Sequence, residues 1–148
     1  MIAIGLAAAA TASAITAYLV HDPRPRGVFG QAEVSGSWMM NYGNMQLQVE
    51  PDGTVYGVYE HDEGILIGRY ENDVIKGVWC ELPTRRGPSD AGHFEVRFAR
   101  ANDRLLMEGR WRYGDSPSAL WQPDWVGFAL STPNVILEQR IQRRLPCP

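Results

Sequence analysis

His61, Asp62 and Glu63 follow one another in a polar turn and have the side chains of metal ligands. Imidazole and carboxylate groups bind Zn²⁺ or Ca²⁺, but adjacent residues rarely converge on one ion without a ligand from elsewhere in the chain. The other histidines, His21 and His93, show no metal-binding spacing to this turn. We therefore predict a solvated turn. No set of residues for nucleophilic catalysis and no phosphate-binding loop is recognisable, so we predict that the protein is not an enzyme and has no cofactor.

The two cysteines, Cys80 and Cys147, form neither a disulfide framework nor a metal-binding pattern. We predict that both are free thiols and that Cys80 is a buried structural residue. A single long-range disulfide between them is the alternative.

Glycine and an aromatic residue recur two positions apart. The pairs are Gly36/Trp38, Gly57/Tyr59, Gly77/Trp79 and Gly109/Trp111. A spacing of two puts both residues on one face of a strand, where the glycine leaves room for a neighbouring ring and eases strand curvature. We predict that five rings converge on the interior of a β-structure and form a candidate ligand-binding set: Trp38, Tyr59, Trp79, Trp111 and Trp125.

Turn residues divide the chain after the first thirty residues into eight strand-sized pieces. The predicted strands are Val34–Asn41, Met45–Glu50, Thr54–Glu60, Gly64–Tyr70, Val74–Glu81, Gly92–Ala99, Arg104–Arg112 and Trp121–Leu130. Several of these strands alternate apolar and polar residues, which indicates one buried and one solvated face. Eight antiparallel strands joined by short turns can close into an up-and-down barrel, which has no free sheet edge. We therefore predict a mainly β protein with this barrel at residues 33–130.

The third, fourth and fifth predicted strands are apolar on both faces, as Tyr56 and Val58 show beside Val55 and Tyr59. An apolar outer face of this size indicates an interface, and we predict that other subunits bind there. The alternative is that the C-terminal segment covers it. Arg69 lies in the same region. If inward, it would bind an anionic ligand or an acidic residue, but we predict an outward surface position.

Residues 131–148 are predicted to form a helical tail. Thr132 is the predicted cap, Pro133 suits the first helical position, and Pro146 ends the helix. Leu137, Ile141 and Leu145 recur every four residues. This pattern predicts an amphipathic helix that packs on protein, with a membrane surface as the alternative partner.

Residues 1–20 contain no charged side chain. A helix of this length spans about 30 Å of bilayer, so we predict a single transmembrane helix, followed by a proline-rich linker at residues 21–32. Small residues spaced by four predict a helix-packing stripe. They are Gly5, Ala9, Ser13 and Ala17. A cleaved signal peptide and a soluble helix are the alternatives. The following arginines, Arg24 and Arg26, favour a cytoplasmic barrel on a bacterial-type inner membrane.

The motifs GSWMMNYGNMQL, GTVYGVY, GHFEVRF, EGRWRY and WVGF, in that order, resemble the pattern of the avidin family over about residues 35–130. The resemblance implies an eight-stranded barrel with a small-ligand site in its lumen. It places Tyr59 where the family has a biotin-contacting tyrosine, and Trp111 and Trp125 near lumen tryptophans. Asn41 or Asn44 would supply polar contacts from the first strand.

The sequence departs from that family at one ligand position. Met40 stands where the family has the asparagine that binds the ureido oxygen of biotin. We therefore predict that biotin is not the ligand.

The net charge of −3 comes from 14 basic and 17 acidic residues, which are mixed along the chain. Nucleic-acid binding needs a clustered basic face, so we predict no nucleic-acid partner. Two functions fit the sequence. One is a membrane-anchored accessory subunit of a larger complex, bound through the N-terminal helix and the apolar outer face. The other is an avidin-like binder of a small ligand, and an open lumen would favour it over a lumen packed solid by Met40, Trp79 and Trp111.

Overall fold

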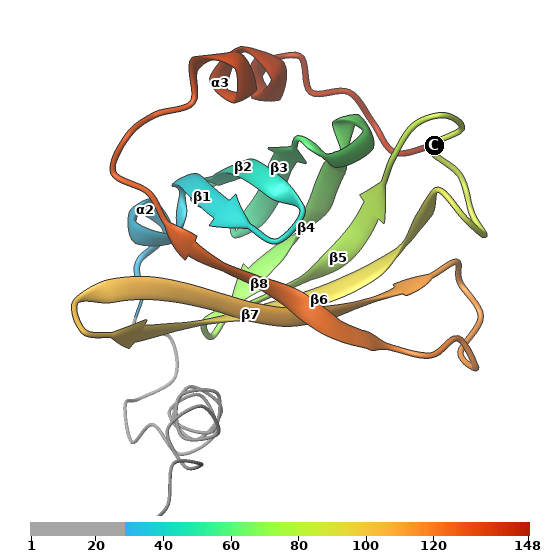
Figure 1. The fold of residues 1–148 in the computed structure, drawn as a ribbon, viewed down its shortest axis with the longest axis horizontal. Helices are drawn as coiled ribbons and strands as arrows, with labels where there is room; N and C mark the ends of the chain where they lie inside the picture. The colour runs from blue at the N-terminus through green and yellow to red at the C-terminus, as the bar shows by residue number, and fades with distance from the viewer. Residues whose placement is uncertain (1–28) are drawn as a thin grey trace, which may run out of the picture.

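The computed structural model describes residues 29–148, and these form an eight-stranded antiparallel barrel with a short helix at each end of the described chain (Figure 1). The strands are β1 Gly36–Met40, β2 Gly43–Val49, β3 Thr54–Tyr59, β4 Ile65–Glu71, β5 Val74–Cys80, β6 Ala91–Ala101, β7 Arg104–Tyr113 and β8 Gln122–Ala129. The helices are α2 Gln31–Val34, η1 His61–Glu63 and α3 Val135–Gln142. Each strand pairs with the next in sequence, and β8 pairs with β1 to close the barrel. The predicted barrel and its strand order are thus confirmed.

The transmembrane helix, its small-residue stripe (Gly5, Ala9, Ser13 and Ala17) and the linker up to residue 28 lie outside the described residues. Among residues 29–148, each helix is too short or too polar to cross a bilayer.

Inward-facing residues follow the predicted alternation and fill most of the lumen. Residues from every strand meet there, such as Trp38, Leu47, Val55 and Phe94, all at most 2% exposed. The glycines allow close approach between neighbouring strands, which is a stricter requirement than the strand curvature predicted for them. A Cβ added at Gly77 would lie 2.0 Å from the carbonyl oxygen of Ile67 in β4, so β4 and β5 can approach this closely only without a side chain at that position.

One end of the lumen is closed by α2 and the segment before it. Val34 and Phe29 belong to the same buried cluster as Trp38, and the indole Nε1 of Trp38 donates to the carbonyl of Val34 at 3.1 Å. Tyr70 donates its hydroxyl to the Phe29 carbonyl and to Asp73 Oδ1. The sequence-based prediction did not include α2, whose four residues are too few for a helical period.

The C-terminal segment crosses the outside of the barrel, with α3 over β2 and β3 (Figure 1). Leu137 and Ile141 are buried against Tyr56, Val58 and Ile65. This confirms that the tail packs on protein, and it means that α3 covers this part of the apolar outer face. Partner binding at that face stays a prediction. Arg69 points outward, as predicted, and donates to the Asp52 carbonyl.

Three predictions about the tail were wrong. Cys80 and Cys147 are not free thiols but form a disulfide, with Cα atoms 5.8 Å apart. Cys80 faces outward at the end of β5, where the returning tail brings Cys147 against it. The helix cap is Asn134 and not Thr132, because the Asn134 side-chain oxygen accepts the Leu137 amide at 3.1 Å. The helix accordingly begins after Pro133, and it ends at Gln142 rather than at Pro146, so the predicted apolar residue Leu145 lies beyond it.

Candidate functional site

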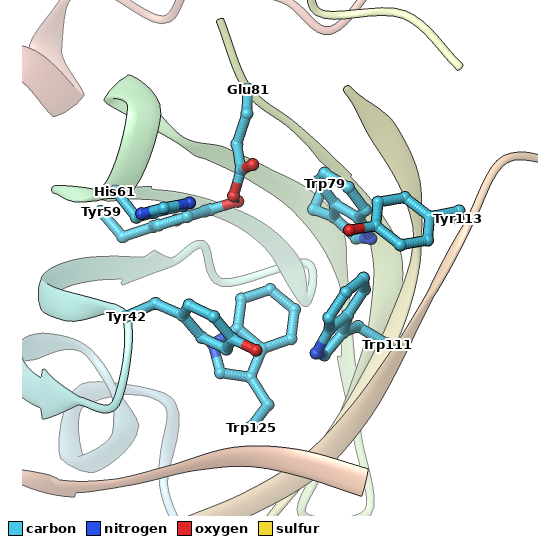
Figure 2. Close-up of a pocket in the computed structure, with 8 residues that line it drawn as sticks. All are labelled: Tyr42, Tyr59, His61, Trp79, Glu81, Trp111, Tyr113 and Trp125. Carbon is cyan, nitrogen blue, oxygen red and sulfur yellow. The ribbon is translucent and has the colours of Figure 1, made fainter. Parts of the chain in front are cut away.

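The other end of the lumen holds a cavity of about 200 Å³ that opens to solvent (Figure 2). Six aromatic residues, one histidine and one glutamate line it. They are Tyr42, Tyr59, His61, Trp79, Glu81, Trp111, Tyr113 and Trp125. Tyr59, Trp79 and Trp125 are at most 4% exposed and form the deep part. His61 and Tyr113 are exposed and form the rim, so the cavity is a cup with an open mouth.

The strands position these side chains through their two-residue period. Tyr59, Trp79 and Trp111 are the inward residues near the mouth ends of β3, β5 and β7. The residues two positions further on continue the same face beyond, or at the end of, each strand. They are His61, Glu81 and Tyr113, and Tyr42 follows Met40 of β1 in the same way.

Tyr59 and Glu81 form a hydrogen-bonded pair on one wall. The Tyr59 hydroxyl donates to Glu81 Oε1 at 2.7 Å, and Figure 2 shows the carboxylate directly above the phenol. Burial raises the pKa of the Glu81 carboxyl, although the Tyr59 hydrogen bond acts in the opposite direction. Burial and the neighbouring carboxylate raise the pKa of Tyr59 well above its ordinary value, so the phenol stays protonated and keeps donating.

Asp124 holds the opposite wall from behind. Its Oδ1 accepts the Trp111 indole N–H at 2.7 Å and its Oδ2 accepts the Tyr42 hydroxyl at 2.8 Å. Burial, and then the Asp124 contact, raise the pKa of Tyr42 to about 12. Asn41 in turn accepts the Val126 amide at 3.1 Å and donates to the Asp124 carbonyl, which fixes β8 against the turn after β1.

Several pairs of rings in the cavity stand nearly perpendicular to one another. Tyr42 makes angles of 87° with Trp111 and 89° with Trp125, and Trp79 makes an angle of 90° with Trp111. Edge-to-face contacts of this kind are favourable between aromatic rings. They also form the cavity as a box with differently oriented walls, rather than as a stack of parallel rings.

The hairpin that carries His61 is held from outside the barrel. Arg140 of α3 donates to the carbonyls of Tyr59 at 2.9 Å and Gly64 at 3.3 Å. Inside, the Tyr59 ring lies against Gly64, where an added Cβ would be 2.0 Å from the ring. The tail therefore supports the wall of the cavity that contains Tyr59.

Potential metal ligands lie at the rim. One ligand atom each from His61, Asp62 and Glu81 lie within 4.8 Å of one another. Glu81 supplies the distant partner that the sequence did not reveal for this turn, while Glu63 is outside the group. Two of the three residues are exposed, and Glu81 Oε1 already accepts the Tyr59 hydrogen bond. The prediction of a solvated turn stays open.

The structure brings four of the six predicted lumen residues together at the cavity: Tyr59, Trp79, Trp111 and Trp125. Trp38 lies instead in the closed end of the lumen, packed against Phe98 with ring centroids 5.3 Å apart. Asn41 is exposed and joins β1 to β8 rather than lining the cavity. Asn44 likewise bonds to Glu60 at the rim.

Sequence reasoning missed Tyr42, His61, Glu81 and Tyr113. A signal for them was present, because each follows an inward residue by two positions. For Tyr42, His61 and Tyr113 the predicted strand ends hid it, since the period was not continued into the turns. Glu81 was the last residue of a predicted strand but was not assigned to its inner face.

No protein-family model matches the chain, and no curated protein matches it. Among solved structures, apo shwanavidin superimposes with a TM-score of 0.52 at 12% sequence identity, over 65% of this chain and 100% of that one. The chain has an avidin-like fold. At this identity the likeness shows the fold alone, and it confirms at that level the resemblance seen in the strand motifs.

Proposed function

We propose that the barrel is a binding protein for a small organic ligand, which it takes into the cavity at its mouth. The observation that carries this proposal is the cup itself. An apolar, mostly aromatic cavity with a few placed polar groups is the usual form of a small-molecule site. The lumen is packed solid only at the end closed by α2, so the eight-strand frame leaves space where the rings converge.

The competing hypothesis, an accessory subunit of a membrane complex, rests on two features. The first is residues 1–20, which lie outside the described part of the chain. The second is the apolar outer face of β3–β5, part of which α3 covers. It stays a prediction. The Cys80–Cys147 disulfide supports an oxidising compartment for the barrel, in contrast to the cytoplasmic side predicted from Arg24 and Arg26.

The test is a ligand screen by saturation-transfer NMR on the purified full-length chain in nonionic detergent, with neutral, cationic and anionic small molecules. His61→Trp places an indole at the exposed rim and narrows the mouth. Arg97→Trp adds the same group on the outer face of β6, away from the cavity. We expect compounds that bind the wild type and Arg97→Trp but not His61→Trp. A screen without any such compound would contradict the proposal.

A further inference from the structure

We propose that the ligand is an organic cation whose tertiary or quaternary ammonium group sits among the aromatic rings of the cavity. This inference rests on the proposed small-ligand function and names its ligand class. Three properties of the cavity carry it: the π surface of its walls, the assignment of its hydrogen-bond donors, and the sign of its charge.

The walls offer π surface on several sides. Six of the eight lining residues are aromatic, and ring angles near 90° between several of them arrange them as a box. A cation near the face of Trp or Tyr is attracted by the negative ring quadrupole, and quaternary ammonium groups are bound in proteins by such aromatic cages. A weakly hydrated methylated ammonium loses little hydration on entering.

Four of the seven side-chain donors of the lining are already used within the protein. The hydroxyls of Tyr42 and Tyr59 donate to Asp124 and Glu81. The indole N–H groups of Trp79 and Trp111 donate to the Arg112 carbonyl and to Asp124. Four donors are therefore turned to protein acceptors. The Trp125 indole, the Tyr113 hydroxyl and the His61 ring make no such hydrogen bond among residues 29–148. The rest of the lining presents carboxylate oxygen and ring surface, which suits a cationic ligand better than a carboxylate or a ureido oxygen.

The fixed charges of the lining have the matching sign, although Arg85, outside the lining, is close enough to act against the raised pKa of Tyr59. Glu81 lines the cavity, Asp124 lies behind Tyr42 and Trp111, and no Lys or Arg is among the lining residues that the structure describes. Asp62 and Asp90 add negative charge near Glu81, while His61 is the one lining side chain that can carry positive charge. An anion such as biotin would meet Glu81 unpaired, at a desolvation cost that a cation avoids.

The size limits the ligand to a compact group. An apolar cavity of roughly 150 Å³ holds one benzene molecule. The cavity here, about 200 Å³, accommodates a trimethylammonium group with a few more atoms, and the open rim lets the rest of a longer molecule extend into solvent.

The first experiment compares two probes of nearly equal shape: choline, and its neutral carbon analogue 3,3-dimethylbutan-1-ol. Both are titrated into the purified full-length chain in nonionic detergent, by calorimetry and by tryptophan fluorescence, with EDTA present to keep metals from His61, Asp62 and Glu81. We expect choline to bind at least about tenfold more tightly than the alcohol, which corresponds to one strong cation–π contact plus the carboxylate.

The variants isolate the charge and the rings. Glu81→Gln keeps an oxygen for the Tyr59 hydroxyl but removes the charge, and we expect about a tenfold loss of choline affinity with little effect on the alcohol. Glu71→Gln, on the exposed end of β4, is the matched control and should not change binding. Trp111→Leu should weaken choline binding, and Phe128→Leu, whose ring lies outside under Arg104, should not. Near-ultraviolet circular dichroism checks that each variant is folded.

The outcomes distinguish the cation proposal from the small-ligand function on which it rests. Equal affinity for choline and the alcohol, or Glu81→Gln binding choline as well as the wild type, overturns the cation proposal. Binding of neutral or anionic screen compounds without cations also overturns it, but leaves the proposed small-ligand function standing. A free metabolite and a lipid headgroup share this ammonium chemistry. Preference for choline over glycerophosphocholine supports the free form, and equal binding of the two supports a headgroup.

Discussion

At the end of the barrel next to α2, Trp38 and Tyr70 direct their polar atoms to backbone carbonyls of the closing segment, at Val34 and Phe29. At the open end, Trp111 and Tyr59 direct theirs to the carboxylates of Asp124 and Glu81. Both ends are aromatic, but only the first has a segment of main chain that enters between the strands. The rings at the mouth are held apart by partners at the rim, so a cavity remains.

The two ends also differ in where their support comes from. The closed end is held by packing inside the lumen. The mouth is held from outside, by the disulfide between Cys80 and Cys147 and by Arg140 on the carbonyls of Tyr59 and Gly64. Aromatic content alone therefore does not distinguish core from site, and the main-chain segment that closes only one end does.

The largest expected effect is on stability at the closed end. Trp38→Ala removes an indole that is 1% exposed, and we expect a loss of about 3–5 kcal/mol in the free energy of unfolding. Trp111→Ala, at a half-buried position by the mouth, should cost about 1–2 kcal/mol and mainly reduce ligand binding. Urea denaturation followed by circular dichroism measures both. Equal losses would contradict the distinction between the two ends.

The second effect tests the outer support. The Cys80–Cys147 bridge spans 67 residues, so Cys80→Ser should lower stability by about 4 kcal/mol at most. Hydrogen exchange should show the loss of protection first at the amides of Tyr59 and Gly64, and later at β6. Wild-type protein in reducing agent is the control and should behave alike. Uniform loss of protection around the barrel would mean that the tail does not act on the mouth in particular.

A smaller effect concerns the Asp124 anchor. Tyr42→Phe removes one hydrogen bond to this carboxylate, and we expect a loss of about 1 kcal/mol in stability. Trp111 fluorescence should also change, because Asp124 then holds the indole alone. Tyr113→Phe changes the same atoms at the exposed rim, where no hydrogen bond of the hydroxyl is seen among residues 29–148, and should be neutral.

The smallest expected effect is on pH dependence. Burial raises the pKa of Glu81 in the folded chain above its unfolded value. The nearby carboxylates of Asp62 and Asp90 raise this pKa further, whereas the Tyr59 hydrogen bond and His61 lower it. Protonated Glu81 therefore favours the fold, and this stability is lost as the pH rises through the folded pKa. The wild type should lose stability relative to Glu81→Gln over the range just above pH ~4.5. A difference that stays constant with pH would contradict the raised pKa.

The affinity for choline should change with pH in the opposite direction to the stability, over the same pH range. Choline should bind more weakly as the pH falls through the Glu81 pKa, because the carboxylate loses its charge, and Glu81→Gln should bind with little pH dependence. Calorimetric titrations at several pH values check this.

The barrel was predictable because its signals are local. Turn residues divide the strands, the two-residue period assigns their faces, and all eight predicted strands agree with the structure to within two residues at each end. The same period brought Tyr59, Trp79 and Trp111 to one cavity. It also placed Trp38 in the lumen. The two-residue period shows which face of the strand a residue is on, but it does not show how far along the barrel axis the residue lies. The sequence therefore did not show that α2 covers the end where Trp38 lies.

The remaining features depend on tertiary contacts. Glu81 meets His61 only because β3 and β5 deliver their ends to one rim, and Cys147 meets Cys80 only because α3 turns the tail across the outer wall. Neither contact has a local pattern. The Asn134 cap differs by two residues from the predicted Thr132 because both side chains can accept the same kind of amide hydrogen bond, and the position of the first turn decides between them.

The closure of one barrel end by α2 and Phe29 determines how a ligand can enter and leave the lumen. Because the barrel is closed at this end, a ligand enters and leaves through the mouth. A bound ligand therefore has one orientation, with the same group always innermost. The far end of a bound molecule stays outside. A resin or fluorophore tethered to that end should therefore leave capture intact, which makes the unknown guest accessible to pull-down chemistry.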